Sequence, residues 1–280
     1  MSTICIVLVT YAFFPKQLFD STMNTRHDIR WYIFFHGHDV NVLHELQQFA
    51  GTTNTLFHPY GINRGLARSW NDGLRLFVRE RGDILLFIND DVLFYNNAFD
   101  EYVDFIISTK RNIPDFGQIS VFGLETGTAE ALGSGDTLGK PAYQGLACSA
   151  IGENAIEKIG YFDQNFWPVY FTDTDYMHRI DIACLPRPTD TRTLLEHNRS
   201  LTTRIDPSLR KLHDERFKRG QEYYLRKWGG LPLAETFASP FADPRFDFFI
   251  SSARTGAPYG PDYDRHDLAT AGTIGVMQGE

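Results

Sequence analysis

Short apolar runs alternate with amphipathic segments throughout the first half of the chain, and this alternation constrains the fold more than any other feature. Runs rich in β-branched and aromatic residues predict buried strands at 4–11, 30–35, 55–58, 84–88 and 118–124. Apolar residues at helical spacing predict helices between these strands, at 15–25, 42–50, 65–81 and 98–109. Strands that alternate with helices favour an α/β fold, in which helices flank a mostly parallel central sheet.

The second half of the chain is less regular. We expect a Gly-rich loop at 126–140, a strand at 142–151, and helices at 154–159, 177–182 and 216–228. Gly229 and Gly230 end the last of these helices. Pro, Gly and Asp are frequent beyond residue 231, so we expect residues 231–280 to form a C-terminal extension, either an arm or a cap.

Charge and composition narrow the class of protein. The formal net charge is −8, from 27 basic and 35 acidic residues, which argues against a nucleic-acid-binding surface. No apolar run is long enough to cross a membrane, and the run at 4–9 is too short for the core of a signal peptide. The cysteines Cys5, Cys148 and Cys184 lack metal-site spacing and fit a reducing compartment. We therefore expect a cytoplasmic protein, with peripheral contact to a membrane left open.

Two adjacent carboxylates, Asp90 and Asp91, directly follow the apolar run at 84–88 and Asn89. Such a pair is costly unless a positive charge lies beside it, and a divalent cation carrying a substrate phosphate is a natural partner. Ligands of open α/β sheets bind at the carboxyl ends of strands, where this pair is predicted to lie. The alternative is a solvated turn, because Asn and Asp are common turn residues.

A second acidic pair, Asp173 and Asp175, precedes the helix predicted at 177–182. One of these carboxylates could act as a general base, or both could cap the helix. Asn63 and Gly65 lie at the start of the helix predicted at 65–81, where they form either a plain cap or an anion site to which Arg64 or Arg68 adds charge.

Histidines near the predicted strand ends carry further alternatives. His36 and Asp39, with His38 between them, could contact a nucleobase or form a simple loop, and a zinc site lacks further ligands nearby. On the residues alone, His197 is interpreted as a surface histidine.

Four segments, in this order along the chain, resemble nucleotide-sugar glycosyltransferases of the family-2 type, which have the GT-A fold. They are the first strand ending in Thr10-Tyr11; Asn63-x-Gly65 followed by Asn71-x-Gly73; Asn89-Asp90-Asp91 at the place of the family's DxD motif; and Gly160-Tyr161-Phe162-Asp163 followed by Asp173-x-Asp175 and Arg179. Further along the chain, Glu222-Tyr223-Tyr224 and Lys227-Trp228-Gly229-Gly230 resemble the end of the domain in some bacterial and viral members of the family.

The resemblance covers roughly residues 1–230 and implies one GT-A domain, with a donor-binding half at 1–125 and an acceptor and catalytic half at 126–230. It implies inverting transfer of a sugar from a nucleoside-diphosphate sugar, UDP- or dTDP-linked by default, to a saccharide or glycoconjugate acceptor, with Mn²⁺ or Mg²⁺. It assigns Asp91 and His197 to the metal, and Asp173, preferred over Asp175, to catalysis. The donor-binding residues that it implies are Thr10, Tyr11, His36, Asp39, Asn63, Gly65, Arg68, Asn89 and Asp90.

The chain departs from the family pattern at three places. Phe35-His36-Gly37-His38 follows the second strand, where family members often carry Asp-Asn-Gly-Ser with an Asp that contacts the base. Asn89 stands in place of the first Asp of DxD, and Thr172 stands in place of the Glu before Asp173. Asn89 and Thr172 leave open a degenerate relative that binds nucleotide or glycan without turnover. A nucleotidyltransferase is a third reading, which the absence of Gly and Arg from 10–17 disfavours. The C-terminal extension could mediate oligomerisation or cover the acceptor site.

Overall fold

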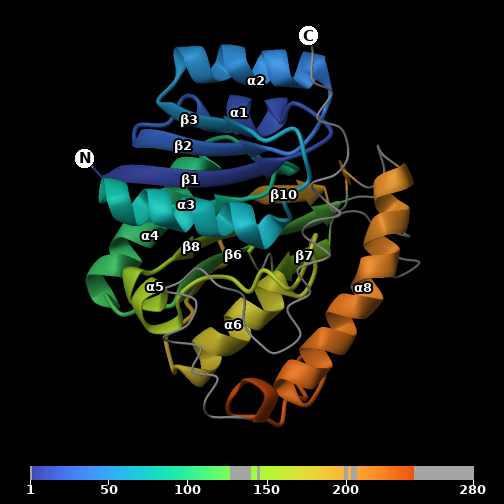
Figure 1. The fold of residues 1–280 in the computed structure, drawn as a ribbon. Helices are drawn as coiled ribbons and strands as arrows, with labels where there is room; N and C mark the ends of the chain where they lie inside the picture. The colour runs from blue at the N-terminus through green and yellow to red at the C-terminus, as the bar shows by residue number, and fades with distance from the viewer. Residues whose placement is uncertain (1, 127–139, 144–145, 199–200, 203–206, 243–280) are drawn as a thin grey trace.

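The computed structural model describes residues 2–126, 140–143, 146–198, 201–202 and 207–242. Its centre is a twisted sheet with the strand order β3-β2-β1-β4-β8-β6-β10-β5, and β7 and β9 also pair with β6 (Figure 1). The strands are β1 (Thr3–Thr10), β2 (Asp28–Phe35), β3 (Thr55–Pro59), β4 (Ile84–Ile88), β5 (Val92–Phe94), β6 (Gln118–Thr126), β7 (Lys140–Tyr143), β8 (Cys148–Ile151), β9 (Thr189–Asp190) and β10 (Leu195–Asn198).

The first four strands in the order, β3, β2, β1 and β4, are parallel to one another. β8 runs antiparallel to both of its neighbours, β4 and β6, and β10 is parallel to β6 but antiparallel to β5. This arrangement confirms the predicted α/β class with a mostly parallel central sheet.

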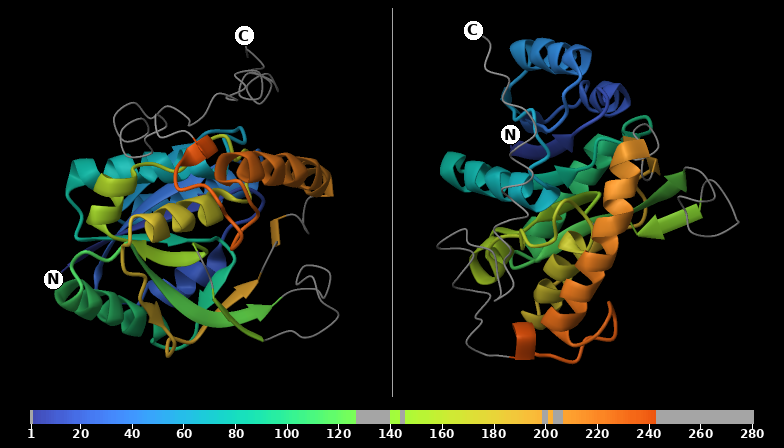
Figure 2. Two further views of the ribbon diagram at one scale, coloured as in Figure 1. Left: turned by 90° about the horizontal axis from the view of Figure 1, so that it is seen from below. Right: turned by 45° about the vertical axis from the view of Figure 1, so that its right-hand side comes forward.

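Helices cover both faces of the sheet (Figures 1 and 2). They are α1 (Lys16–Thr22), α2 (Val40–Thr52), α3 (Leu66–Glu80), α4 (Ala98–Asn112), α5 (Glu153–Ile159), α6 (Thr172–Ile182), α8 (Pro207–Trp228) and the 3₁₀ helix η1 (Pro240–Ala242). β1 shows why its sequence is a continuous apolar run: Ile6 faces the core under α1, α2 and α4, whereas Val7 faces the core under α3, α5 and α6.

The irregular second half differs from its predictions in detail. The strand predicted at 142–151 is two strands, β7 and β8, and the short strands β5, β9 and β10 were not predicted. Two to four residues are too few to show a clear alternation. α6 and α8 begin earlier than predicted, at Thr172 and Pro207, because their first turns are polar and lack apolar periodicity. Most of the predicted loop at 126–140 and residues 243–280 of the C-terminal extension lie outside the described residues.

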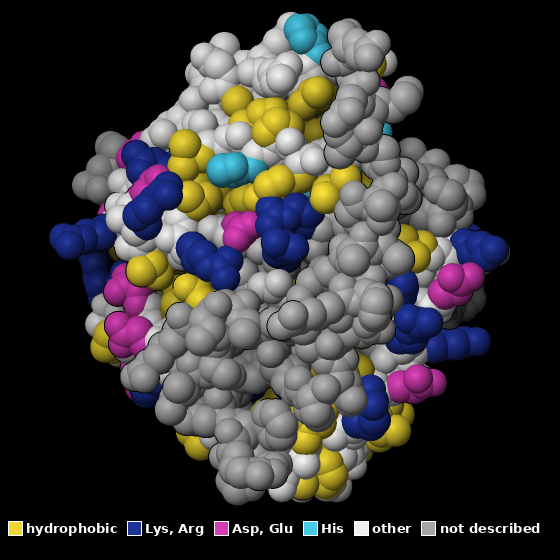
Figure 3. Space-filling model, in the orientation of Figure 1, with side chains coloured by type: hydrophobic (Ala, Val, Ile, Leu, Met, Phe, Trp, Pro, Cys, Tyr) yellow, Lys and Arg dark blue, Asp and Glu magenta, His cyan; other side chains and the backbone are white. Residues whose placement is uncertain are grey.

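α8 runs along one side of the molecule and packs its C-terminal half beside α6 (Figure 2, right). A separate apolar cluster of Phe166, Tyr223, Tyr224 and Trp228 holds this half of the helix. Exposed residues on the outer side of α8 carry charges of both signs, as expected for a solvated face (Figure 3).

Gly73 lets α3 approach the sheet closely. A Cβ at this position would lie 2.5 Å from the nearest side-chain atom of Val7. We therefore expect Gly73→Ala to lower the free energy of unfolding by about 1–3 kcal/mol, although Ala is the better helix former. Chemical denaturation measures this change. Gly51→Ala in α2 is the matched control, because nothing lies within 4 Å of its Cβ, and we expect it to raise stability by about 0.5–1 kcal/mol.

Candidate active site

A cavity of about 540 Å³ opens at the carboxyl ends of β1, β2 and β4. Residues from these strand ends line one side, and residues from segment 168–173 and α8 line the other. Nine of the predicted site residues line this cavity: Thr10, Tyr11, His36, Asn63, Asn89, Asp90, Asp91, Asp173 and His197. Thus the fold brings together residues that are far apart in the sequence.

Asp91 and His197 meet because β5 pairs with β10. Val92 is in register with His197, and the Asn198 N–H donates to the Asp91 carbonyl oxygen at 2.9 Å. The His197 Nε2 atom lies 3.1 Å from Asp91 Oδ1, and both side chains are about nine-tenths buried. The two residues predicted to bind a metal are therefore in contact, although their role stays a prediction.

Asp90 and Asp91 create a strongly acidic tip at the end of β4. Burial and the neighbouring Asp91 carboxylate raise the pKa of Asp90 well above its usual value. Asn89 shapes the tip through its backbone, since its N–H donates to the Ala147 carbonyl oxygen at 2.8 Å. A cation at this tip would relieve the repulsion between the two carboxylates.

The donor set fits a divalent cation that is bound partly by substrate. Apart from its contact with His197 Nε2, the buried Asp91 Oδ1 atom has no hydrogen-bond partner among the described residues. In the same residues, no group of three or more acidic, His or Cys side chains is arranged to hold a metal. The protein would thus supply Asp91 and His197, and phosphates and waters would complete the coordination, as is common for Mg²⁺.

Asp173 and Asp175 lie in the first turn of α6 but point to different places. Asp173 lines the cavity, whereas Asp175 is fully buried behind it. Burial by itself raises the pKa of Asp175, but the Lys227 ammonium and the Arg179 guanidinium outweigh it and lower the pKa below its usual value. Asp175 is therefore ionised and bound, and only Asp173 faces the space in which a substrate would lie.

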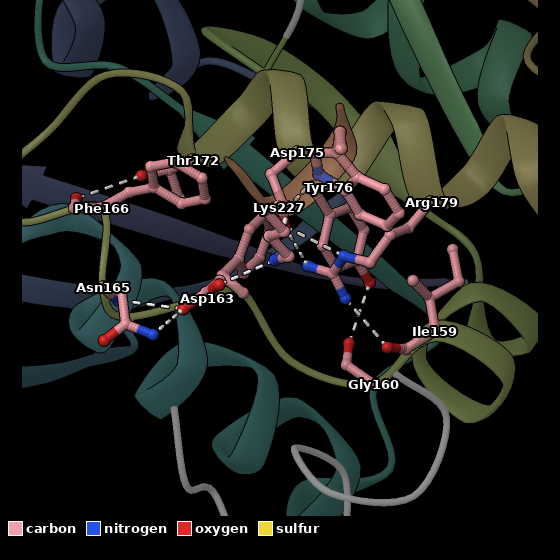
Figure 4. A network of polar contacts seen from close by, with 12 residues as sticks. Ile159, Gly160, Asp163, Asn165, Phe166, Thr172, Asp175, Tyr176, Arg179 and Lys227 are labelled. Atoms are coloured by element: carbon pink, nitrogen blue, oxygen red, sulfur yellow. Dashed lines mark hydrogen bonds and ion pairs between the residues drawn. The ribbon is translucent and has the colours of Figure 1, made fainter. Parts of the chain in front are cut away.

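A buried polar network fixes the start of α6 to α8 (Figure 4). Lys227 Nζ lies 2.6 Å from Asp175 and 2.7 Å from Asp163, and Arg179 Nε donates to Asp175 at 3.0 Å. Trp228 Nε1 also donates to Asp175, at 2.9 Å. Asp163 and Arg179 belong to the motifs noted in the sequence, and here they hold the helix that carries Asp173.

The backbone N–H groups of Gly65 and Leu66, at the start of α3, donate hydrogen bonds to other residues of the protein. The Asn63 side chain accepts the Gly65 N–H at 3.0 Å, and the Leu66 N–H donates to the Pro168 carbonyl oxygen at 2.8 Å. Gly65 has φ +82, and a Cβ there would lie 2.5 Å from Trp167. Thus Gly65 is required for the close contact between α3 and segment 167–168.

Three predicted donor-binding residues do not line the cavity: Asp39, Gly65 and Arg68. The Asp39 side chain accepts the N–H of Asn41, at 2.8 Å, and that of Val42, so it caps α2. Arg68 is half-buried on α3. Their contact with a substrate stays a prediction.

His36 is buried at the end of β2, where its Nε2 atom lies 2.7 Å from Ser69 Oγ. Burial, with a smaller effect of Arg64, lowers the pKa of His36 to about 4. The imidazole is therefore neutral at pH 7. His38 is exposed beside it, and a zinc site at this loop finds no support in the described residues.

Because the pKa of His36 is lowered, we predict that the free energy of unfolding decreases in mild acid. Below about pH 6.5 the unfolded chain binds a proton that folded His36 does not, so unfolding is favoured as the pH falls from 6.5 to about 4. We expect His36→Gln to remove part of this slope, about 1.4 kcal/mol per pH unit, in urea titrations at several pH values. His38→Gln, at an exposed position, is the control, and an equal change in both variants would contradict the prediction.

Sequence reasoning missed His213 and Phe217 of α8 and Trp70 of α3, which also line the cavity. Tyr170, an aromatic residue shortly before Asp173 that by sequence could lie in the core or stack on a sugar, lines it as well. His213 and Phe217 are four residues apart and so share one face of α8. The four-residue spacing could have indicated a shared helix face, but the many charged residues around His213 and Phe217 in the sequence obscure this pattern.

Comparisons with known proteins agree with the fold. No protein-family profile matches the chain, and no curated protein matches it. Among solved structures, the mannosyltransferase PcManGT from Pyrobaculum calidifontis, in complex with GDP-Man and Mn²⁺, matches with a TM-score of 0.51 and 14% identity over 69% of this chain and 56% of that one. S. aureus TarS 1–349 in complex with UDP-GlcNAc matches with a TM-score of 0.51 and 10% identity over 70% of this chain and 58% of that one.

The chain therefore has the GT-A fold of nucleotide-sugar glycosyltransferases, as the sequence motifs predicted. It spans less than two thirds of the length of both these chains. None of the helices in the described part of the chain has the length and apolarity needed to cross a membrane.

Proposed function

We propose that the chain is a metal-dependent, inverting glycosyltransferase that moves a sugar from a nucleoside-diphosphate sugar to a saccharide or glycoconjugate. One observation carries this proposal: the Asp91–His197 pair and Asp173 line the same cavity, at the strand ends where α/β folds bind ligands. The fold shared with PcManGT and TarS supports it.

Asp91 and His197 would hold Mn²⁺ or Mg²⁺, which neutralises the charge that develops on the departing diphosphate. The acidic tip alone would repel that diphosphate. Consequently donor binding should depend on the metal, and the neighbouring Asp90 should ionise more readily once the metal is bound.

Asp173 would act as the general base. It accepts the proton of the acceptor hydroxyl while the hydroxyl oxygen bonds to the anomeric carbon and the bond to the diphosphate oxygen breaks, with its electron pair leaving on the diphosphate. Attack from the side opposite the leaving group inverts the anomeric centre. Asp175, fixed by Lys227 and Arg179, would position the turn that carries Asp173.

The donor nucleotide would lie against the strand-end side of the cavity, near His36 and Asn63. We expect UDP- or dTDP-linked sugars. GDP-linked sugars belong in the same screen, because the two structural neighbours bind GDP-Man and UDP-GlcNAc.

A second candidate function is nucleotide or glycan binding without turnover. Asn89 and Thr172 favour it, because each stands where the family pattern has an acid. Thr172 also lines the cavity, but its hydroxyl, which donates to the Phe166 carbonyl oxygen at 3.5 Å, cannot supply the charge of a carboxylate there.

A thermal-shift screen of UDP, dTDP and GDP, with and without MnCl₂, tests donor binding. We expect one diphosphate nucleoside to raise the melting temperature only with metal, because a ligand of the native state stabilises it. Mass spectrometry of the matching sugar donor, incubated with protein and Mn²⁺, then detects transfer or donor hydrolysis. No shift with any nucleotide would contradict the proposal, and a metal-independent shift without turnover would favour the binding protein.

A further inference from the structure

Arginine residues form a stripe along the outer side of α3. Arg68, Arg75 and Arg79 recur at helical spacing and so share one side of the helix, and Arg64 comes just before it in the sequence. The opposite side of α3 is apolar and packs on the sheet. In Figure 3, Lys and Arg side chains gather over α3. We call Arg64, Arg68, Arg75 and Arg79 the arginine stripe.

The half of the stripe nearer the start of α3 carries more positive charge than its neighbours neutralise. Asp72, on the same side of α3, lies 3.3 Å from Arg64 and 2.7 Å from Arg75. Arg68 is half-buried, and no acidic partner contacts it in the described part of the chain. One carboxylate therefore faces three guanidinium groups.

The far end of the stripe is positive as well. Arg79 lies 3.2 Å from Glu80, but Glu80 lies closer, at 2.6 Å, to Arg30 of β2. Arg75 and Arg79 are four residues apart, and like charges at this spacing destabilise a helix. A positive surface of this kind is unusual in a chain whose formal net charge is −8. The repulsion within the stripe would be relieved by an anionic ligand.

Aromatic rings hold two of the stripe guanidinium groups in place. The Arg64 Cζ atom lies 3.9 Å from the centroid of the Tyr60 ring, and the Arg75 Cζ atom lies 4.7 Å from that of Tyr161. A guanidinium that is held in this way loses less conformational entropy when a ligand binds. Its N–H groups match the paired oxygens of carboxylates and phosphates. The stripe is thus suited to a ligand that carries such groups.

The stripe begins at the rim of the cavity. Asn63 and Leu66, on either side of Arg64 in the sequence, both line the cavity. From Leu66 to Arg79 the helix extends about 20 Å away from this point. A ligand that contacts the whole stripe is therefore a chain of several units, one end of which lies beside the cavity.

The surroundings of the stripe favour a glycan over other polyanions. A helix that binds a membrane inserts exposed apolar side chains, but among the large apolar residues of α3, all of which are described, only Val78 is exposed. The net charge of −8 disfavours a nucleic acid. A saccharide chain, by contrast, fits a stripe that starts at the proposed site of sugar transfer.

We propose that the arginine stripe binds an anionic glycan, a saccharide chain with carboxylate or phosphate groups, and that this chain is the acceptor. The role as acceptor rests on the proposed function, whereas binding to the stripe does not. The chain lies along α3 and places one end in the cavity, where Asp173 can reach a hydroxyl group.

Three forms of one polymer test binding to the stripe: dextran, carboxymethyl dextran and dextran phosphate of the same length, each with a fluorescent label. Fluorescence anisotropy measures the affinity of the whole chain for each polymer, without nucleotide or metal. We expect both anionic dextrans to bind at least about tenfold more tightly than dextran at about 0.05 M NaCl. Most of this difference should vanish at about 0.5 M NaCl, because salt screens exposed charges.

Arg75→Gln/Arg79→Gln should weaken binding of the anionic dextrans about tenfold and leave the nucleotide-induced thermal shift unchanged, because neither residue lines the cavity. Arg111→Gln/Arg226→Gln is the matched control, since it removes the same charge from exposed positions on α4 and α8. We expect this control to bind like the wild type. Arg79→Glu, which keeps both ion pairs of Asp72, is the second stripe variant in case the first is unstable.

Equal affinity for the three dextrans, or unchanged binding in the stripe variants, would overturn the inference. Tighter binding to phosphatidylglycerol vesicles or to single-stranded DNA than to either anionic dextran would also overturn it, in favour of a membrane or a nucleic acid.

Initial rates with anionic and neutral oligosaccharides, and the sugar donor identified above, test the role as acceptor. The KM for an anionic acceptor should rise about tenfold in Arg75→Gln/Arg79→Gln. Transfer to neutral saccharides alone would refute this role even though the donor is turned over. Absence of nucleotide binding in the wild type would instead refute the proposed function, and binding of the anionic dextrans would be unaffected.

Discussion

Asp91→Asn is expected to lower metal-dependent sugar transfer at least about 100-fold, because metal stabilisation of a leaving diphosphate contributes several kcal/mol to the barrier. The substitution keeps the size of the side chain and removes the charge that would hold the cation. It should also abolish the effect of Mn²⁺ on the nucleotide-induced thermal shift. Initial rates over a range of Mn²⁺ concentrations separate weaker metal binding from a slower chemical step.

His197→Ala completes the test, because His197 contacts Asp91 at 3.1 Å. If both residues act through one cation, the double variant should be little worse than Asp91→Asn alone, since their effects are not additive. Asp115→Asn, at an exposed position, is the control for loss of an acidic charge. Full activity of Asp91→Asn in the presence of a chelator would refute the metal role.

Lys227→Met is expected to lower the free energy of unfolding by about 3–5 kcal/mol, because it leaves buried carboxylates without their cation. Lys227 and both of its partners, Asp163 and Asp175, are buried, with Nζ–oxygen distances of 2.7 and 2.6 Å. Arg179 still pairs with Asp175 in this variant, so most of the loss of stability comes from the Asp163 carboxylate, which loses its ion pair with Lys227. Urea denaturation followed by circular dichroism measures the change.

Arg226→Met is the matched control, because Arg226 is the exposed neighbour of Lys227 on α8. We expect it to change stability by less than about 0.5 kcal/mol. The double variant Asp163→Asn/Lys227→Met should recover part of the lost stability, since it removes the buried Asp163 charge that Lys227→Met leaves without a cation. A Lys227→Met protein as stable as Arg226→Met would show that the buried network contributes nothing net.

The parallel half of the sheet could be predicted from the sequence because its strands are buried on both sides. Runs such as Ile84–Ile88 are wholly apolar, and the long helix α3 has a clear apolar face. The acidic tip and Asp173 could be located for a similar reason, since each charged residue directly follows or precedes a recognisable element. Their shared place in one cavity agrees with the GT-A resemblance.

The rest of the site could not be predicted, because it depends on contacts between distant segments. The three residues of β5 carry no periodic signal, yet their pairing with β10 brings His197 to Asp91. Likewise, the sequence does not show that Asp175 turns into the protein while Asp173 faces the cavity. That difference arises from Lys227 and Trp228, about fifty residues further along the chain.

The late position of these two anchors has a consequence for biosynthesis. A ribosome synthesises the sheet, α3 and α6 before it makes Lys227 and Trp228, so the nascent chain at first holds the Asp163 and Asp175 carboxylates without the Lys227 cation. Until α8 packs against α6, the Asp163 and Asp175 carboxylates are more stable in water than buried, which opposes packing of the protein interior around them. The turn that carries Asp173 should therefore be among the last parts of the chain to reach its final structure, and a chain that stops short of Trp228 should keep its sheet without fixing that turn.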